Sequence, residues 1–229
     1  MTFLTPASCP ARQRGEARHS TFRVAAGDAE PRLPDFLRMV EAASLRLVDL
    51  LAVLVDPRQL PSISGVWARL EAQRSVAIDT PWAMAVLRAL EVPSMRGDPA
   101  TISSGLRRDR QDIDRCLEGL EAAGLARKVQ GTWRPVAMGA VDTRRTPETA
   151  RRLKAFWARV GVERLEAGVD GGFAYNLVSV SLEQLHRLRE AHDAYFQAVR
   201  SIVAEDAPPD CVALICLQVV RLDDTRTGA

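Results

Sequence analysis

The chain has 229 residues, 47% of them apolar, and a formal net charge of only +2 at neutral pH. This length favours about two domains with a sizeable core, and the apolar content excludes an intrinsically disordered chain. Because the net charge is so small, any case for nucleic-acid binding must come from where the charges lie. No apolar run approaches the length of a membrane span; residues 50–55, for example, cover only six residues.

The cysteines give no sign of a metal centre. Cys9, Cys116, Cys211 and Cys216 form no CxxC pair, and no histidine lies near them at the spacing of metal ligands. The N-terminus contains arginines but no apolar stretch of the kind that secretory signals need. We therefore expect reduced thiols in a cytoplasmic protein without a metal or a cofactor.

The first hundred residues divide into an arm and a helical region. Residues 1–33 are rich in Pro, Gly, Arg and Ala without periodicity, which predicts an irregular arm. Residues 34–97 show apolar side chains at helical spacing in three stretches, the first ending at Asp56-Pro57 and the second starting after Pro61. The third is expected to begin with Asp79 or Thr80 as its N-cap. Trp67 and Trp82 are interpreted as core residues.

Residues 98–140 begin with two short helices. Asp98 followed by Pro99 predicts the start of the first, and Asp109 predicts the N-cap of the second. Gly124 supplies the left-handed residue that ends the second helix. Its expected inner face consists of Ile113, Cys116, Leu117 and Leu120.

A hairpin is predicted directly after these helices. The Gln130-Gly131 pair separates two short basic runs, as a two-residue turn between antiparallel strands does. Trp133 alternates with Val129 and Leu125 and is expected to pack on the helices. Two helices, a turn and a hairpin together predict a winged helix-turn-helix unit.

The C-terminal part, residues 141–222, is predicted to be a small α/β region followed by a tail at 223–229. Thr146 and Pro147 start one helix, and Ser181 with Gln184 forms a capping box for a longer one. Segments 173–180 and 211–220 have the composition of buried strands, so strand, helix and strand predict a parallel crossover. The buried stripe of the long helix is expected to be Leu185, Leu188, Phe196, Val199 and Val203. The fold class is thus mainly α with small β elements.

Charge is distributed unevenly along the chain. Residues 101–165 contain 14 Arg or Lys against 8 acids, a net of +6, whereas residues 166–229 contain 5 against 10, a net of −5. The basic third coincides with the predicted winged helix and the helix after it. The side chains expected to contact DNA are Arg107, Arg108, Arg127, Lys128, Arg134, Arg144 and Arg145. The acidic C-terminal part is expected to contact a protein partner or a second copy of the chain.

The second helix of the winged unit weakens the DNA interpretation. It carries acids such as Asp112, Asp114 and Glu118, and carboxylates repel phosphates. An alternative is therefore a protein-interaction or effector-sensing module whose winged helix does not bind DNA.

Several stretches resemble a bacterial family of uncharacterised predicted transcriptional regulators. They are PWAMAVLRALEV (81–92), RCLEGLEAAGLARKVQGTW (115–133), VDTRRTPETARRLKAFWARVGVERL (141–165), FAYNLVSVS (173–181) and LICLQVVRL (214–222). The resemblance covers about residues 22–222. It implies an N-terminal helix-turn-helix of the phage-repressor type, followed by a long domain of unknown function.

The chain departs from the family pattern at both ends. Val24-Ala25 stands where the family has Trp-Glu, and about twenty residues precede this point, too few for the first helices of a repressor-type module. We expect this module to be truncated or decayed, which leaves the winged unit as the DNA-contact candidate. Near the other end, Val219-Val220-Arg221 stands where an aromatic residue and a proline are usual.

No catalytic constellation is present in the sequence. His186 and His192 are six residues apart and do not share a helical face. There is no glycine-rich phosphate loop, no HExxH and no nucleophile elbow. Asp109, Asp112 and Asp114 lack the glycine and terminal glutamate of a calcium loop. We therefore predict that the protein is not an enzyme.

Overall fold

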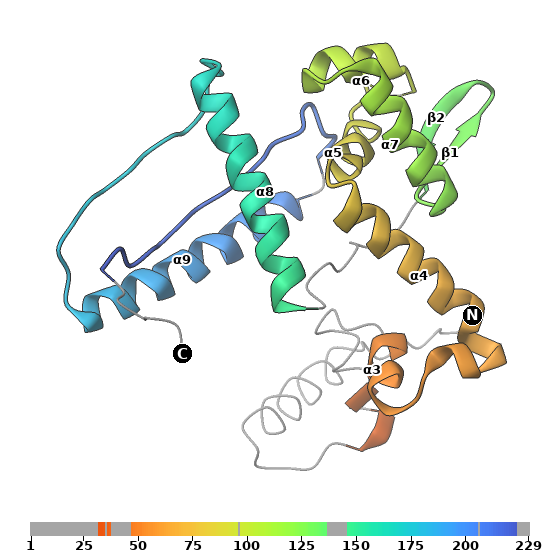
Figure 1. Cartoon of the computed structure of the whole chain (residues 1–229), viewed down its shortest axis with the longest axis horizontal. Helices are drawn as coiled ribbons and strands as arrows, with labels where there is room; N and C mark the ends of the chain where they lie inside the picture. Colours follow the sequence, from red (N-terminus) through yellow and green to blue (C-terminus); the bar gives the residue numbers. More distant parts are fainter. Residues whose placement is uncertain are drawn as a thin grey trace, which may run out of the picture. The chain divides into compact units, whose positions relative to one another are not determined.

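The computed structural model describes residues 32–34, 36–37, 47–95, 97–136, 146–205 and 207–223 (Figure 1). Within these ranges the chain is mainly helical, with seven α-helices, one 3-10 helix and one two-stranded sheet. The predicted mainly α fold with small β elements is thereby confirmed. The chain divides into two compact units, Met1–Ala68 and Arg69–Ala229, with the boundary inside helix α4. The predicted arm lies almost wholly outside the described residues.

The first unit contains α3 (Leu47–Leu54), the 3-10 helix η1 (Pro57–Gln59) and the start of α4 (Pro61–Asp79). Asp56 ends the run of apolar residues and caps η1, because its Oδ1 accepts a hydrogen bond from the Arg58 backbone N–H at 3.0 Å. The predicted break at Asp56-Pro57 and the helix after Pro61 are both confirmed. Trp67 is buried, as expected.

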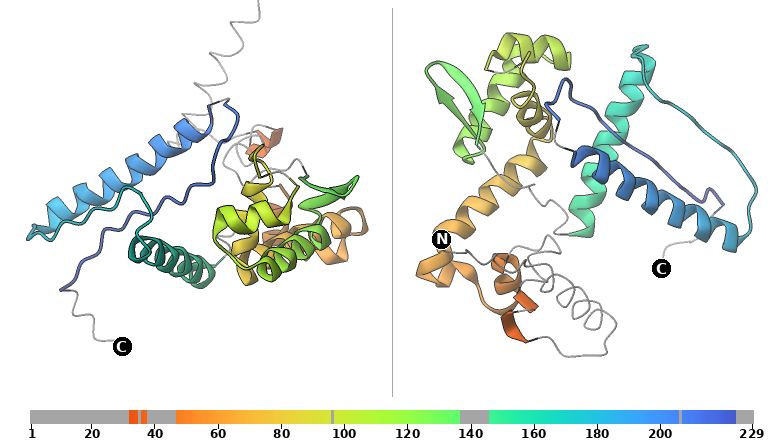
Figure 2. Two further views of the ribbon diagram at one scale, coloured as in Figure 1. Left: turned by 90° about the horizontal axis from the view of Figure 1, so that it is seen from above. Right: turned by 180° about the vertical axis from the view of Figure 1, so that it is seen from behind.

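In the second unit, three helices and a hairpin share one core. They are α5 (Trp82–Ala89), α6 (Pro99–Leu106), α7 (Arg110–Ala122), β1 (Ala126–Val129) and β2 (Thr132–Pro135), here called the α5–β2 unit. The hairpin lies beside α7 in each view (Figures 1 and 2). All four predicted inner-face residues of α7 are buried, together with Leu90, Ile102, Leu125 and Trp133. Burial of such side chains is the main stabilising term of a small domain.

Local signals explain where these helices begin and end. Asp98 caps α6 by accepting from the backbone N–H groups of Ala100 and Thr101, at 3.0 and 3.2 Å. Gly124 (φ 69°) ends α7: its N–H donates to the Glu121 carbonyl at 2.9 Å, and Leu125 N–H donates to the Leu120 carbonyl at 2.8 Å. These two bonds form a Schellman motif.

Two predicted caps differ from the structure. The N-cap of α5 is Pro81 rather than Asp79 or Thr80, because α4 continues as far as Asp79. Asp109 occupies the N-cap position of α7, but its side chain makes no capping hydrogen bond. The backbone hydrogen bonds of the turn, from the Arg107 and Arg108 N–H groups, go to the Ser104 and Ser103 carbonyls at the end of α6.

Helix α8 (Pro147–Glu166) follows the α5–β2 unit. Thr146 caps it as predicted, because its Oγ1 accepts from the Thr149 N–H at 3.1 Å. The helix buries Leu153 and Val160, and the ring of Trp157 meets that of Trp82 edge-on at a centroid distance of 5.7 Å. Trp82 is thus a packing residue, as expected.

Helix α9 (Leu182–Val203) has the predicted Ser181–Gln184 capping box, but its predicted burial is wrong. None of its residues is buried, although Leu185, Phe196 and Val199 are half-covered. A helical stripe is buried only when another element covers it. In the structure its flanking segments do not form a sheet that could do so.

The strands predicted at 173–180 and 211–220 are not formed. Both segments are without regular secondary structure, and no backbone hydrogen bond joins them within the described residues. The predicted parallel crossover is therefore wrong for the single chain. A strand exists only when another backbone edge pairs with it, and a sequence pattern does not supply that edge.

None of the helices in the described ranges is both long enough and apolar enough to cross a membrane.

Candidate nucleic-acid interface

The β1–β2 hairpin places two arginines directly opposite each other. Its antiparallel register pairs Arg127 with Arg134 and Lys128 with Trp133. The Gln130-Gly131 turn has positive φ at both positions, 51° and 82°, as a type I′ turn requires. The predicted turn is therefore confirmed, and it fixes which side chains face each other.

The cations of this hairpin are exposed and have no acidic partner among the described residues. Arg127, Lys128 and Arg134 all face solvent, and none forms an ion pair with a carboxylate in the part of the chain that the structure describes. Like charges directly opposite on two strands are destabilising. The Arg127–Arg134 pair therefore has no evident structural benefit, and it concentrates positive charge where an anion could bind.

The hairpin is held by its other face. Trp133 is only 8% exposed and belongs to the core of the α5–β2 unit. Lys128 Nζ lies 5.9 Å from the centroid of the same ring. This distance suits a weak cation–π contact that keeps the ammonium group near the hairpin while leaving it exposed.

A close backbone approach also sets the position of β2. Gly97, just before α6, has φ 78°, and a Cβ placed on it would lie 1.9 Å from Thr132 Cγ2 and 3.3 Å from the Trp133 backbone nitrogen. Only glycine fits this contact without displacing β2. The start of α6 and the second strand of the hairpin are therefore packed directly against each other.

The turn between α6 and α7 contains the next two predicted contacts. Arg107 is the C-cap of α6 in the left-handed conformation (φ 49°), and its side chain is exposed. Ser103 closes the turn: its Oγ donates to the Arg108 carbonyl at 2.6 Å, and its carbonyl accepts from the Arg108 N–H at 3.0 Å. Of the two arginines, Arg107 is the one available for a ligand.

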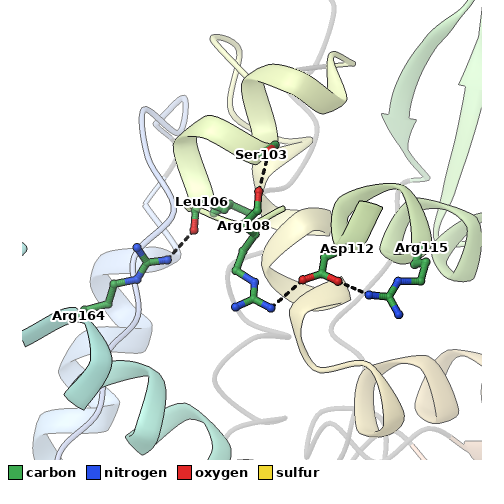
Figure 3. A network of polar contacts seen from close by, with 6 residues as sticks. All are labelled: Ser103, Leu106, Arg108, Asp112, Arg115 and Arg164. Carbon is green, nitrogen blue, oxygen red and sulfur yellow. Dashed lines mark hydrogen bonds and ion pairs between the residues drawn. The ribbon is translucent and has the colours of Figure 1, made fainter. Parts of the chain in front are cut away.

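Arg108 is directed into the protein rather than outward (Figure 3). Its Nη2 donates to Asp112 Oδ2 at 2.8 Å, and its guanidinium carbon lies 5.0 Å from the centroid of the Trp82 ring. Arg164 of α8 approaches the same ring at 5.9 Å and donates to the Leu106 carbonyl at 2.5 Å. The structure therefore separates Arg108 from the exposed cations of the hairpin.

Arginines of α7 and the preceding turn pair with the acids of that helix. Arg110 binds Asp114 at 2.9 Å, and Asp112 is held between Arg108 and Arg115. The hydrogen bond from Arg115 is the main cause that lowers the pKa of Asp112 below its usual value of 3.8, opposed by a smaller burial effect. The Asp112 carboxylate is thus ionised and partly neutralised at neutral pH.

The remaining charge of α7 is still negative. Residues Arg110–Ala122 contain two arginines and four acids, a net of −2, and the exposed Glu118 and Glu121 have no ion-pair partner among the described residues. The positive side of the α5–β2 unit is consequently the hairpin and Arg107, and not the exposed face of α7.

Helix α8 contains further basic side chains, some exposed and some in contact with other elements. Arg151, Lys154 and Arg159 are exposed, whereas Arg152 Nη2 lies 3.3 Å from both the Ile78 carbonyl and Asp79 Oδ1. The packing role of Arg164 was not predicted, because it depends on a backbone carbonyl 58 residues away. The predicted contacts Arg144 and Arg145 lie outside the described residues.

Groups that could support other chemistry are dispersed. Within the described ranges, no three His, Cys, Asp or Glu side chains are arranged to hold a metal ion. Cys116 is buried in the core, and burial raises the pKa of its thiol to about 11, which keeps it protonated and unreactive. His192 Nε2 lies 3.2 Å from the Leu217 carbonyl oxygen, a contact between α9 and the segment that follows it.

Searches with the whole chain found no matching family model, no matching curated protein and no matching solved structure.

Proposed function

We propose that the α5–β2 unit is a winged helix that contacts double-stranded DNA mainly through its wing, and that the chain is a transcriptional-regulator-like protein. The observation that carries this proposal is the cross-strand pair of Arg127 and Arg134, which is exposed and lacks an acidic partner among the described residues. The resemblance of residues 22–222 to predicted regulators and the net charge of +6 over residues 101–165 support it. A cytoplasmic location is part of the same proposal.

The contacts expected from this geometry are to the phosphate backbone. Guanidinium groups bind phosphate oxygens through charge-assisted hydrogen bonds, often two at a time. Arg127 and Arg134 lie opposite each other on one face of the hairpin and suit the phosphates of a DNA backbone. Lys128, on the face that carries Trp133, and Arg107, at the α6–α7 turn, are further exposed cations of the same unit. Such contacts position a protein on DNA but do not select a base sequence.

The acidic surface of α7 limits how the DNA can be bound. A helix of net charge −2 that enters the major groove would bring Glu118 and Glu121 close to phosphates. Docking by the wing avoids this repulsion. We therefore expect binding with weak sequence preference and a strong dependence on salt concentration.

The experiment is to measure binding of the full chain to a random-sequence duplex by fluorescence anisotropy over a series of salt concentrations. The Arg127→Ala/Arg134→Ala variant should bind more weakly, with a log–log salt slope shallower by about two, because each lost phosphate contact removes about one unit. A control of equal charge change is Arg69→Ala/Arg88→Ala, two exposed arginines on α4 and α5. This control should retain most of the slope.

Two outcomes would contradict the proposal. One is the absence of salt-dependent binding by the unmodified chain at low ionic strength. The other is an equal loss of affinity in the wing variant and in the control, because the net charge alone would then account for the binding.

The second candidate function is a protein-interaction or effector-sensing module in which the winged helix does not contact DNA. The exposed acids of α7, Glu118 and Glu121, favour it, because they would suit a basic protein surface. Failure of the DNA-binding experiment would leave this alternative as the better proposal.

A further inference from the structure

The C-terminal region exposes two apolar segments that pair with no other strand in the part of the chain that the structure describes. Segments 173–180 and 211–220 lie on either side of α9 in the sequence and run in the same direction in all views (Figures 1 and 2). Neither forms a β-ladder among the described residues. Apart from the Leu217 carbonyl, which contacts His192, and the Phe173 N–H, which donates to Gly171, their backbone groups make no hydrogen bond among the described residues and can pair with another strand.

Exposed large apolar side chains are concentrated in these segments. Tyr175 is 92% exposed and Leu177 79%, and the nine such residues are Phe173, Tyr175, Leu177, Val178, Val180, Leu214, Ile215, Leu217 and Val220. Because one aromatic side chain alone can bury about 150–250 Å², nine half-exposed apolar side chains amount to on the order of 1,000 Å² per chain. A standard protein interface buries about 800 Å² on each partner. The exposed area is therefore sufficient for a stable interface.

The two segments also lack the features that normally protect a free edge. Neither 173–180 nor 211–220 contains a charged residue or a proline, whereas solvent-exposed edge strands usually carry one or the other. Apolar residues occupy both faces, as in strands that are covered on both sides. Such segments are suited to the inside of a sheet rather than to its exposed edge.

We infer that segments 173–180 and 211–220 pair with the same segments of a second copy of the chain, forming an intermolecular β-sheet covered by α9. Two strands from each copy would give four, enough for an independently stable sheet, whereas two alone are not. A symmetric dimer uses the same surface on both copies, so that surface must complement itself.

The charges of the two segments and of α9 favour a second copy of the chain over a strongly charged protein partner. The two segments are uncharged, and α9 balances Glu183, Glu190 and Asp193 against Arg187, Arg189 and Arg200. A copy brought against these elements therefore meets no net repulsion, although residues 166–229 as a whole carry −5. Nothing in the uncharged segments would select an oppositely charged partner.

The experiment measures the oligomeric state of the full chain by sedimentation equilibrium over a range of concentrations. The unmodified chain should be a dimer, and Leu177→Lys/Val220→Lys should weaken dimerisation by at least about tenfold, because it places charges inside the sheet. The control Val162→Lys/Leu165→Lys places the same charges at exposed apolar positions of α8 and should remain dimeric.

Folding of the variants can be checked separately from dimerisation. All four tryptophans, at positions 67, 82, 133 and 157, lie outside both segments, so the tryptophan fluorescence spectrum reports folding of the rest of the chain separately from these segments. An unchanged tryptophan spectrum with loss of the dimer supports the inference. A second measurement is amide hydrogen exchange, which should show protection of 173–180 and 211–220 in the unmodified chain and loss of this protection in the segment variant.

Three results would overturn the inference. If the chain is a monomer and the amides of both segments exchange rapidly, the surface does not bind a second copy. A monomer with protected segments would show that they pair within one chain. A dimer that persists in the Leu177→Lys/Val220→Lys variant would place the interface elsewhere.

Discussion

Arg127 and Arg134 are direct cross-strand partners in the β1–β2 hairpin, so two like charges face each other with no carboxylate bound to either in the described part of the chain. The pair costs the hairpin some stability, because its charges repel. If the pair binds phosphate, stability and DNA binding should respond in opposite directions when one charge is reversed.

Arg134→Glu tests this opposition. The variant places a carboxylate opposite Arg127, and an opposite-charge pair stabilises a hairpin by about 0.2–1 kcal/mol. Thermal unfolding should therefore occur at a slightly higher temperature, while affinity for duplex DNA falls. The control Arg107→Glu has the same charge change but no cross-strand partner, and it should reduce affinity without raising stability. An Arg134→Glu variant that gains affinity would contradict the phosphate role of the wing.

Trp133→Ala should destabilise the protein through its core. The indole is 8% exposed and packs with the helices of the α5–β2 unit, so its removal should cost about 3–5 kcal/mol in the free energy of unfolding. Urea unfolding measures this value. Trp133→Phe retains most of the apolar contact and should cost clearly less. If Trp133→Ala kept normal stability but lost DNA binding, the residue would have a contact role instead.

Features that depend on a few neighbouring residues could be predicted from the sequence. The Asp98 cap, the Gly124 helix end, the Gln130-Gly131 turn and the Ser181–Gln184 capping box each involve residues at most five apart in the chain. Their physical cause is a local backbone hydrogen bond or a positive φ, and both leave a residue-type signal.

Features that depend on distant residues could not be predicted. Arg108 was grouped with the wing cations, but its contact with Trp82 arises only when the α6–α7 turn packs against α5, and the sequence does not show this packing. The strands at 173–180 and 211–220 were inferred from composition, yet strand formation requires a second backbone edge that the single chain does not bring to them. Composition thus identified the apolar segments but not what pairs with them.

Gly97→Ala should be more destabilising than other glycine substitutions in this unit. Both Gly97 (φ 78°) and Gly124 (φ 69°) adopt the left-handed conformation, but only at Gly97 would a Cβ clash, at 1.9 Å from Thr132 Cγ2. Gly124→Ala, with no atom within 4 Å of the added Cβ, measures the conformational strain alone, about 1–2 kcal/mol. The extra loss in Gly97→Ala therefore measures the clash with β2, and Thr132→Ala should recover part of it. Equal losses at the two glycines would mean that β2 moves aside freely.

The Asp98 cap predicts a loss of stability at acid pH. The hydrogen bond from the Thr101 hydroxyl is the largest cause that lowers the pKa of Asp98 below its ordinary 3.8, followed by the one from the Ala100 N–H. The folded state stabilises the ionised form of Asp98 relative to the unfolded state. The contribution of this cap to the free energy of unfolding is therefore fully present above about pH 3.8, and it is lost as the pH falls through the lower pKa of the folded protein. Asp98→Asn still caps the helix but cannot titrate there. Thermal unfolding followed from neutral pH downwards should therefore show a steeper acid loss in the unmodified chain than in Asp98→Asn, and parallel curves would show that Asp98 has the same pKa in both states.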